Sequence, residues 1–406
     1  MRCKCGFENA ADARFCGSCT TALGDAPAGA VPNAAVPSTG SRIATRGRRA
    51  GARSLSRMLM TIIAALVAAA AAGYGLQNGT PGQYKQANSG TTTGRLAINP
   101  QFDWAGPFSE GLALVRIGDA TTGKFGYIDK TGKIVITPQS DWASVPAWGR
   151  GFSDGLAPVR IGHEDNGRYG YIDKSGKVAI IPQVDFVYGF SEGLAEVSVG
   201  RKFGYIDKAG KMVINPQFDA GSDEGSRFSE GLAAVLLGDF NTGRWGYIDK
   251  AGKYVINPQF GWADRFSEGL APVLPSDFNL GRSTGRFGYI DKTGKMVINP
   301  QFDWAGPFSE GLAFVRIGDA QTGRFGYIDK TGKYIINPQF DAAGPFSGGL
   351  AFVRIGDAQT GKFGYIDKTG KIVITPQFAA ALGFSEDLAP VRIGDDKTGR
   401  WGYISR

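Results

Sequence analysis

The stretch FSEGLAFVRIGDAQTGRFGYIDKTGKYIINPQF, residues 308–340, holds the features that decide the fold of this chain. Its runs of β-branched and aromatic residues are separated by glycine-containing turns, which is typical of consecutive antiparallel strands. We expect strands over residues 311–317, 325–329 and 333–340, with a tight hairpin turn, DKTGK, before the last. Pro338 cannot donate a ladder hydrogen bond, so the third strand should end or lie at a sheet edge.

This stretch is one copy of a unit that recurs eight times, with a basic period of 38 residues. Each copy carries an F-S-E-G-L-A motif or a variant, an aromatic-Gly-Tyr-Ile motif and an Ile-x-Pro-Gln motif or one close to it. The first motif begins at Phe108, Phe152, Phe190, Phe228, Phe266, Phe308, Phe346 and Phe384. Such self-similarity predicts stacked or radial units that bury their apolar faces against their neighbours.

The array starts with a third strand, residues 95–102, and ends with a second strand, residues 401–404, so one unit is split between its two ends. In a closed ring the last strand can pair with the first and remove the open edges. We therefore predict an all-β, propeller-like array of eight units. An open β-solenoid is the alternative, because propeller blades usually have four strands and only three are evident here, unless the FDWAGPF segment adds a short one.

These motifs resemble the WG repeat family of bacterial proteins, which is named for Trp-Gly ahead of Tyr-Ile-Asp. The resemblance covers about residues 93–406. Only Trp245 and Trp401 keep the tryptophan, whereas five units have Phe and one has Tyr169, so a role that needs the indole N–H does not extend to those six. The resemblance implies a β-repeat structure, interaction roles and no defined catalytic activity.

The four cysteines lie within the first 19 residues, as two close-spaced pairs at Cys3, Cys5, Cys16 and Cys19. Four thiolates on two tight turns fill a tetrahedral zinc shell and leave no open catalytic position. The segment MRCKCGFENAADARFCGSCTTAL also resembles the short zinc ribbons at the N-termini of many bacterial proteins. We expect a zinc ribbon with one structural zinc over residues 1–24, and a redox pair or unliganded thiols is the alternative.

A disordered, Arg-rich linker is expected over residues 25–57, and residues 58–76 form an uncharged apolar run of 19 residues. As a helix this run would be about 28 Å long, close to the roughly 30 Å of the bilayer hydrocarbon. We expect a retained transmembrane helix, with a buried core helix or a cleaved signal peptide as alternatives. A polar spacer, residues 77–93, leads to the array of residues 94–406.

Arginine next to a span favours the cytoplasmic side. Six arginines precede the apolar run at Arg42, Arg46, Arg48, Arg49, Arg53 and Arg57, and only Lys85 and Arg95 follow closely. We therefore expect a single-pass protein of the bacterial cytoplasmic membrane with its N-terminus inside and its repeats outside. Residues 61–406 carry 36 basic and 34 acidic residues, so the array lacks the basic surface expected of a nucleic-acid binder.

An enzyme is not expected. The single histidine, His163, stands in a hairpin loop, which argues against Ser-His-Asp and His-metal sites. The carboxylates recur by repeat, whereas an active site is normally unique, so they indicate structure or repeated weak binding. Seven Asp share one turn position (Asp129 among them), and six Glu share one position in the F-S-E-G-L-A motif (Glu110 among them).

The most informative polar-aromatic feature is a set of tryptophans in the loops between units, at Trp104, Trp142, Trp262 and Trp304. If exposed, they would form platforms for sugar rings or for partner side chains. If buried, they would fill the gaps between neighbouring units. Two functions remain: a scaffold that binds a protein partner, and a cell-wall glycan binder that uses these tryptophans.

Overall fold

The computed structural model describes residues 94–120, 122–139, 151–162, 167–219, 226–239, 242–275, 285–395 and 398–406. Every described residue belongs to one compact unit, which lies within Ser56–Arg406. The expected zinc ribbon, linker, apolar run and spacer therefore lie outside the described residues, as do Trp142 and His163. In the part that is described, no helix has the length and apolar character needed to cross a membrane.

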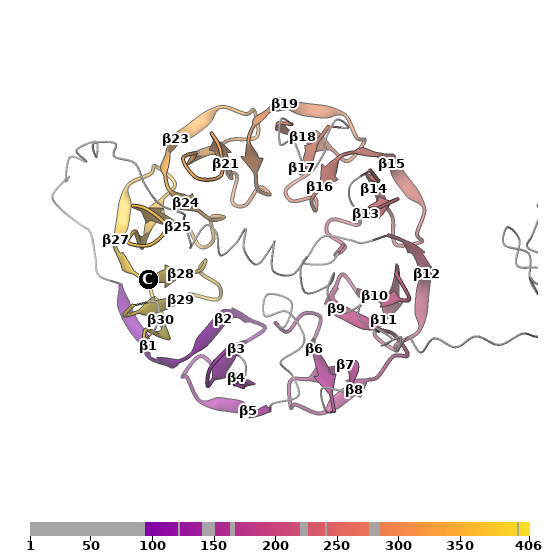
Figure 1. Ribbon diagram of the computed structural model, residues 1–406, viewed down its shortest axis with the longest axis horizontal. Helices are drawn as coiled ribbons and strands as arrows, with labels where there is room; N and C mark the ends of the chain where they lie inside the picture. Colours follow the sequence, from indigo (N-terminus) through magenta and orange to yellow (C-terminus); the bar gives the residue numbers. More distant parts are fainter. Residues whose placement is uncertain are drawn as a thin grey trace, which may run out of the picture. The chain divides into compact units, whose positions relative to one another are not determined.

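The described residues form eight antiparallel sheets, which follow one another around a ring as the blades of a β-propeller (Figure 1). Blade 1 contains β2 (Trp104–Ser109), β3 (Leu112–Ile117), β4 (Lys124–Ile128) and β5 (Ile134–Gln139), and blade 2 contains β6 (Leu156–Ile161), β7 (Arg168–Asp173) and β8 (Val178–Ile180). Blade 3 contains β9 (Phe186–Ser191), β10 (Leu194–Val199), β11 (Lys202–Asp207) and β12 (Met212–Phe218), and blade 4 contains β13 (Ala233–Leu237), β14 (Arg244–Ile248) and β15 (Tyr254–Phe260). Blade 5 contains β16 (Trp262–Ala263), β17 (Leu270–Leu274), β18 (Phe287–Asp291) and β19 (Met296–Phe302), and blade 6 contains β20 (Trp304–Ala305), β21 (Ala313–Ile317), β22 (Arg324–Ile328) and β23 (Tyr334–Phe340). Blade 7 contains β24 (Ala342–Ala343), β25 (Leu350–Ile355), β26 (Lys362–Asp367) and β27 (Ile372–Phe378), and blade 8 contains β28 (Ala380–Ala381), β29 (Leu388–Ile393), β30 (Arg400–Ser405) and β1 (Arg95–Phe102).

Closure of the ring is confirmed by blade 8, where β1 pairs with β30 across the two ends of the array. Arg95 lies opposite Ser405, and Phe102 lies opposite Trp401. Eight buried apolar clusters each join two neighbouring blades, including blades 8 and 1, so no blade presents an open face to solvent. The open solenoid is thereby excluded.

Blades 2 and 4 show three strands in their described residues, and the other six blades add the short inner strand that the FDWAGPF segment allowed for. It comes from the segment between units, and in blades 5 to 8 it is only two residues long, as in β20. Trp304 and Ala305 pair with Arg316 and Val315 of β21. Two residues are too few to produce a recognisable alternation in the sequence. Trp104, Trp262 and Trp304 therefore stand in strands rather than in loops.

The glycine of each aromatic-Gly-Tyr-Ile motif is required by a bulge in the outer strand. In blade 6, Phe325 pairs with Phe340 but Tyr327 pairs with Ile336, so extra residues of β23 crowd β22. A Cβ on Gly326 would stand 2.5 Å from the carbonyl oxygen of Ile336 and 2.7 Å from the nitrogen of Pro338. The same carbonyl would lie 2.4–2.6 Å away in all eight copies, which no side chain tolerates.

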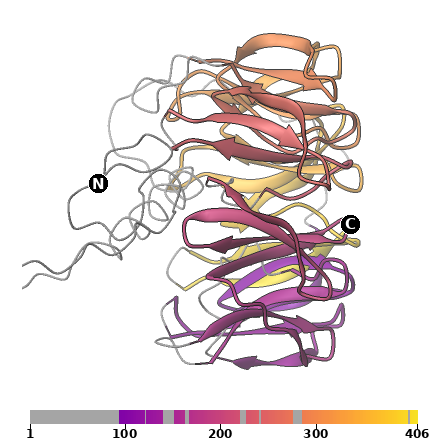
Figure 2. The same ribbon diagram turned by 90° about the vertical axis from the view of Figure 1, so that its right-hand side faces the viewer.

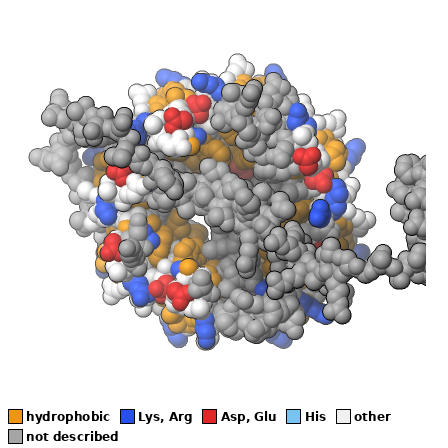
Figure 3. All heavy atoms as spheres, in the orientation of Figure 1, with side chains coloured by type: hydrophobic (Ala, Val, Ile, Leu, Met, Phe, Trp, Pro, Cys, Tyr) orange, Lys and Arg blue, Asp and Glu red, His pale blue; other side chains and the backbone are white. Residues whose placement is uncertain are grey.

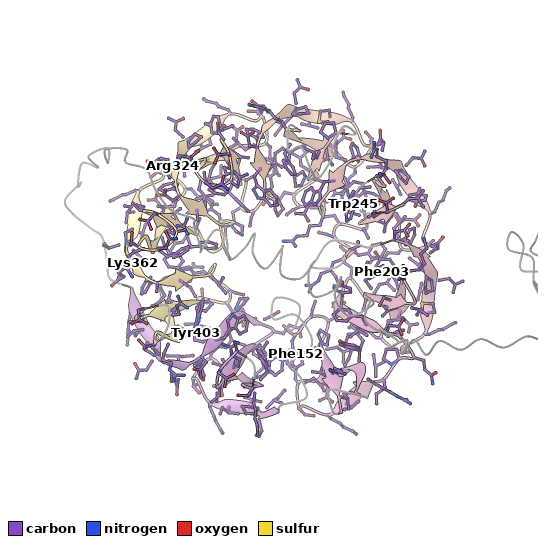
Figure 4. All side chains as sticks on the ribbon, in the orientation of Figure 1. Phe152, Phe203, Trp245, Arg324, Lys362 and Tyr403 are labelled. Atoms are coloured by element: carbon purple, nitrogen blue, oxygen red, sulfur yellow. The ribbon has the colours of Figure 1, made fainter. Side chains whose placement is uncertain are left out.

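An aromatic pair holds every joint between blades. The Tyr of the Gly-Tyr-Ile motif packs against the Phe of the F-S-E motif in the next blade, as in Tyr327 and Phe346, whose ring centroids are 4.8 Å apart. The hydroxyl of Tyr327 also donates to the carbonyl oxygen of Gly344 at 2.9 Å. Tyr403 makes the equivalent contacts from blade 8 to blade 1, and it lies inside the wall of the ring while Lys362 is exposed (Figure 4).

The two faces of the ring carry different turns. One face, the turn face, holds the S-E-G and D-K-T-G-K turns and the C-terminus at Arg406, which Figure 2 shows at one side of the ring. The other face, the loop face, holds the G-D-A-x-T-G hairpin loops. There an aspartate next to the inner strand caps the loop, as Asp303 accepts a hydrogen bond from the backbone N–H of Gly318 at 2.9 Å.

Candidate functional site

Three of the four tryptophans singled out from the sequence occupy the first position of an inner strand, near the loop face. Trp104, Trp262 and Trp304 begin β2, β16 and β20, the strands nearest the centre of the ring (Figure 1). Trp262 pairs with Leu274, whereas Trp304 and Trp104 pair with arginines of their second strands. The equivalence of their positions is confirmed, and their role in binding stays a prediction.

Trp262, Phe287 and Trp304 form an aromatic cluster between blades 5 and 6. The ring centroids of the two tryptophans are 6.0 Å apart, and Phe287 lies 5.3 Å from Trp262 and 5.4 Å from Trp304. The rings meet at interplanar angles of 48–75°, so each covers part of another's face. Trp304 nevertheless keeps 39% of its surface exposed, which makes this cluster both packed and accessible.

Trp104 is in a different setting. It packs over Gly106 of its own strand and lies 6.5 Å from Phe125 of its own blade. The preceding blade offers it no second tryptophan, because Ala380 stands at that place in β28. Blade 7 likewise has Ala342. Among the described residues, which leave out Trp142 of blade 2, two neighbouring tryptophans meet at the joint of blades 5 and 6.

Two further aromatic residues near the cluster were missed by sequence reasoning. Phe314 and Phe352 are half-buried on the second strands of blades 6 and 7, where their rings cover Gly306 and Gly344. The available signal was the variable position of the G-L-A-x-V-R-I motif, which holds Phe in these two copies and other residues elsewhere. Phe314 packs against the apolar core between blades 6 and 7, and Phe352 packs against the one between blades 7 and 8.

Charge next to the cluster comes from an arginine of the second strand, which blades 1, 2, 6, 7 and 8 carry and blades 3, 4 and 5 lack. The guanidinium of Arg316 lies 5.9 Å above the ring of Phe325, a cation–π contact. Burial lowers the pKa of Arg316, and the carboxylates of Asp303 and Asp319 partly offset this. In blade 5 the same position is Leu274, with 1% exposed surface, so the side of the cluster formed by blade 5 is apolar.

The recurring glutamates serve the ring itself. The carboxylate of Glu310 accepts a hydrogen bond from the backbone N–H of Gly349 in the next blade, at 2.9 Å, and pairs with Lys368 of that blade at 3.1 Å. We call this arrangement the clasp. Its acid-to-glycine bond occurs at seven joints, through Glu110, Asp154, Glu192, Glu230, Glu268, Glu310 and Glu386.

The recurring aspartates shape turns. Asp129 accepts hydrogen bonds from the backbone N–H groups of Thr131 and Lys133 at 2.9 and 3.1 Å, and from the Thr131 hydroxyl at 2.6 Å. The hydroxyl bond is the main cause of its lowered pKa. The structural interpretation of both repeated acids is therefore confirmed. Within the described residues, no group of three or more His, Cys, Asp or Glu side chains is arranged to hold a metal ion.

The sequence matches the family model described as WG containing repeat at residues 91–119, 125–162, 169–203, 203–239, 245–274, 287–319, 325–357 and 363–397. These matches cover well over half of the chain. This chain belongs to the WG repeat family. The glycine of the family's Trp-Gly pair is the one that the outer-strand bulge demands, and it is kept in all eight copies while the tryptophan is not. Among curated proteins, no sequence matches this WG repeat chain.

Solved structures with some likeness to this WG repeat protein include a puromycin hydrolase, with 11% identity and a TM-score of 0.40 over 76% of this chain and 51% of that one. Prolyl oligopeptidase B from Galerina marginata has 12% identity and a TM-score of 0.45 over 76% and 55%. Acylaminoacyl peptidase from Pyrococcus horikoshii has 10% and 0.43 over 72% and 58%. The WG repeat chain spans about half the length of these proteins, and at these values the likeness carries no inference about activity.

Proposed function

We propose that this WG repeat propeller is a binding module that holds a protein partner at the aromatic cluster of Trp262, Phe287 and Trp304. The observation that carries the proposal is the exposure of Trp304, 39%, beside a second tryptophan from the neighbouring blade. Tryptophan is enriched among the residues that dominate binding energy at protein interfaces. The folding of the ring does not account for this exposure, since blades 7 and 8 close with alanine at the same place.

A protein partner is favoured over a glycan by the way the rings meet. A sugar ring stacks best on a flat, uncovered aromatic face, whereas these rings cover each other at 48–75°. Apolar side chains of a partner can insert between ring edges beside the exposed part of Trp304. The glycan alternative rests on Trp304 alone, whose uncovered side could stack one sugar.

The charges visible on the ring agree with a partner that is not a polyanion. Acidic and basic side chains lie close together around the face seen in Figure 3. Many of them are paired, as Arg324 is with Asp341 and Lys202 with Asp219. A nucleic acid would require an unbalanced basic surface. An enzymatic role is not proposed either, because the recurring carboxylates are engaged in clasps and turns.

The placement of the module in the cell is also proposed rather than established. Residues 58–76 would hold it in the cytoplasmic membrane, with the propeller outside and a zinc ribbon inside, where Cys3, Cys5, Cys16 and Cys19 would bind one structural zinc. The arginines before the apolar run support this orientation. Protease added to spheroplasts should digest the propeller and spare the ribbon.

Site-specific photo-crosslinking in the full chain tests the binding surface. A photoreactive residue at position 304 should give a crosslinked protein, whereas one at Ile335, which is 46% exposed on an outer strand, should not. Trp262→Ala should weaken capture at position 304, with Ile335→Ala as its matched control. Sedimentation with purified peptidoglycan that depends on Trp304, without any protein crosslink, would instead favour the glycan alternative. If position 304 gives no protein crosslink and sedimentation with peptidoglycan does not depend on Trp304, both the protein-binding and the glycan-binding proposals are wrong.

A further inference from the structure

One buried acid breaks the repeat. The variable position of the G-L-A-x-V-R-I motif is apolar in seven blades, at Leu114, Pro158, Ala234, Pro272, Phe314, Phe352 and Pro390. In blade 3 it is Glu196, on β10, with only 3% of its surface exposed. A carboxyl group in such a place costs stability unless something nearby satisfies it, so its surroundings indicate what it does.

Glu196 reaches across the joint to blade 4. Its Oε2 accepts a hydrogen bond from the backbone N–H of Ser226 at 2.7 Å. The carbonyl oxygen of the same residue accepts from the hydroxyl of Tyr205, also at 2.7 Å. Blade 3 thus holds both backbone groups of Ser226, which is itself buried with 3% exposed.

In blades 5 to 8 the equivalent N–H is satisfied within its own blade. Asp264 donates to the carbonyl oxygen of Pro272 at 3.1 Å, and Gly306 donates to that of Phe314 at 3.0 Å. Gly344 and Leu382 do the same with their own second strands. The joint of blades 3 and 4 shares with these joints only the hydrogen bond that the tyrosine hydroxyl of the preceding blade donates to the carbonyl oxygen. The Glu196 bond therefore replaces a bond within a blade by a bond between blades.

The groups around Glu196 come from three elements. Tyr171 on β7 and Tyr205 on β11 both feel its charge, and Arg227 follows Ser226 in blade 4. Burial is the main cause that raises the pKa of Glu196 from 4.5 to about 7, while the Ser226 N–H and Arg227 act in the opposite direction. The buried Ser226 hydroxyl acts in the same direction as its N–H and also lowers the pKa of Glu196.

We propose that Glu196 is a proton-operated tie between blades 3 and 4, tight while the acid is neutral and loosened when it ionises. Ionisation places a negative charge among apolar and aromatic groups, which is unfavourable because the carboxylate is out of contact with water. Opening the joint would let water reach the carboxylate and would lower that cost. A raised folded-state pKa means that stability from the neutral acid is full below pH 4.5 and is lost as the pH rises through about 7. The joint between blades 3 and 4 is distinct from the aromatic cluster of blades 5 and 6.

Hydrogen exchange of the full chain in detergent tests the tie, with rates corrected for the intrinsic effect of pH. Protection of the Ser226 amide should fall by at least about tenfold from pH 5 to pH 8 and level off above pH 7. The Asp264 amide, at the joint of blades 4 and 5, is the internal control and should keep its protection. In Glu196→Gln, which stays neutral, the Ser226 amide should show no such fall.

Constant protection of Ser226 in the natural chain, or an equal fall in Glu196→Gln, would overturn the proposal. If the variant does not fold, the infrared band of a protonated carboxyl in the natural chain decides the matter. Its disappearance near pH 7, in step with the loss of Ser226 protection, supports the tie. Disappearance near pH 4.5 would refute it.

Discussion

The joint between blades 7 and 8 and the seven clasped joints share one apolar design but differ in one turn. At the clasped joints an acid occupies the first turn position with a positive φ, such as 54° at Glu310. At the joint of blades 7 and 8 this position is Gly348, which cannot reach the next blade. Asp387 replaces the glycine whose backbone N–H would donate the bond, and Arg406 stands where the other copies have lysine.

The difference teaches what keeps an acid in a left-handed turn. A non-glycine residue at positive φ costs about 1 kcal/mol. The clasp offsets that cost at seven joints, and where the clasp is missing the turn reverts to glycine. Arg406 fills the space that a side chain at Gly348 would take and lies 5.6 Å above the ring of Phe384.

The largest effect should come from the feature that all joints share. Tyr327→Ala at a clasped joint and Tyr365→Ala at the joint of blades 7 and 8 each remove a buried ring and its hydroxyl bond. Each should cost about 3–5 kcal/mol in the free energy of unfolding. Denaturant unfolding measures both. Costs that differ by more than about 1 kcal/mol would show that the joints differ in their cores as well.

Removing the clasp itself should have a smaller effect. Glu310→Ala loses the bonds to Gly349 and Lys368 while keeping a strained backbone, and should cost about 1 kcal/mol because the pair is partly exposed. Glu310→Gly, which copies the turn of the joint between blades 7 and 8, should cost less. Equal losses from the two variants would mean that strain plays no part.

The stabilisation that the clasp provides should also be lost at low pH. Burial alone would raise the pKa of Glu310, but the bonds from Lys368 and from Gly349 outweigh it and lower the pKa below 4.5. A lowered folded-state pKa means that the stabilisation is present above pH 4.5 and is lost as the pH falls through the folded value. The gap in stability between the natural chain and Glu310→Gln should therefore narrow below pH 4.5, measured by denaturant titration at each pH. A constant gap would contradict the ion pair.

The smallest expected effect is a gain. Asp387 has φ 72°, directly after Glu386 with φ 51°. Asp387→Gly relieves this strain but gives the unfolded chain more freedom and loses a long ion pair, 3.7 Å, with Arg406. A net stabilisation of about 0.5 kcal/mol should appear as a small rise in the midpoint of thermal unfolding. The same substitution at Asp154, which makes a clasp with Gly193, should instead destabilise.

The sequence was sufficient for the blade and for the closure of the ring, because both are repeated or terminal patterns. The split unit predicted the pairing of β1 with β30 correctly. The inner strands could be stated only as an alternative for the FDWAGPF segment, because two residues carry no periodicity. The partners of the acids escaped it too, since Glu110 meets Gly155, 45 residues away, and recurrence shows that a residue matters without showing what it touches.

The tryptophans were found from the sequence by their spacing, but their environments were not. Trp104 and Trp304 have the same neighbours in the chain, Asp-Trp-Ala-Gly-Pro. They differ because the blade preceding Trp304 supplies Trp262, whereas the blade preceding Trp104 supplies Ala380. Glu196 stood in the sequence as one odd letter among eight, and only its distance to Ser226 gives it meaning.

The split blade has a consequence for how such chains can change length. The array begins with β1 and ends with β30, and these two strands close the ring by pairing with each other. Adding or deleting one copy of about 38 residues between them leaves this pair chemically unchanged. Each joint is likewise made of elements that every copy carries. The closing chemistry is therefore indifferent to copy number, and the number of blades must be set by the angle at which neighbouring blades pack.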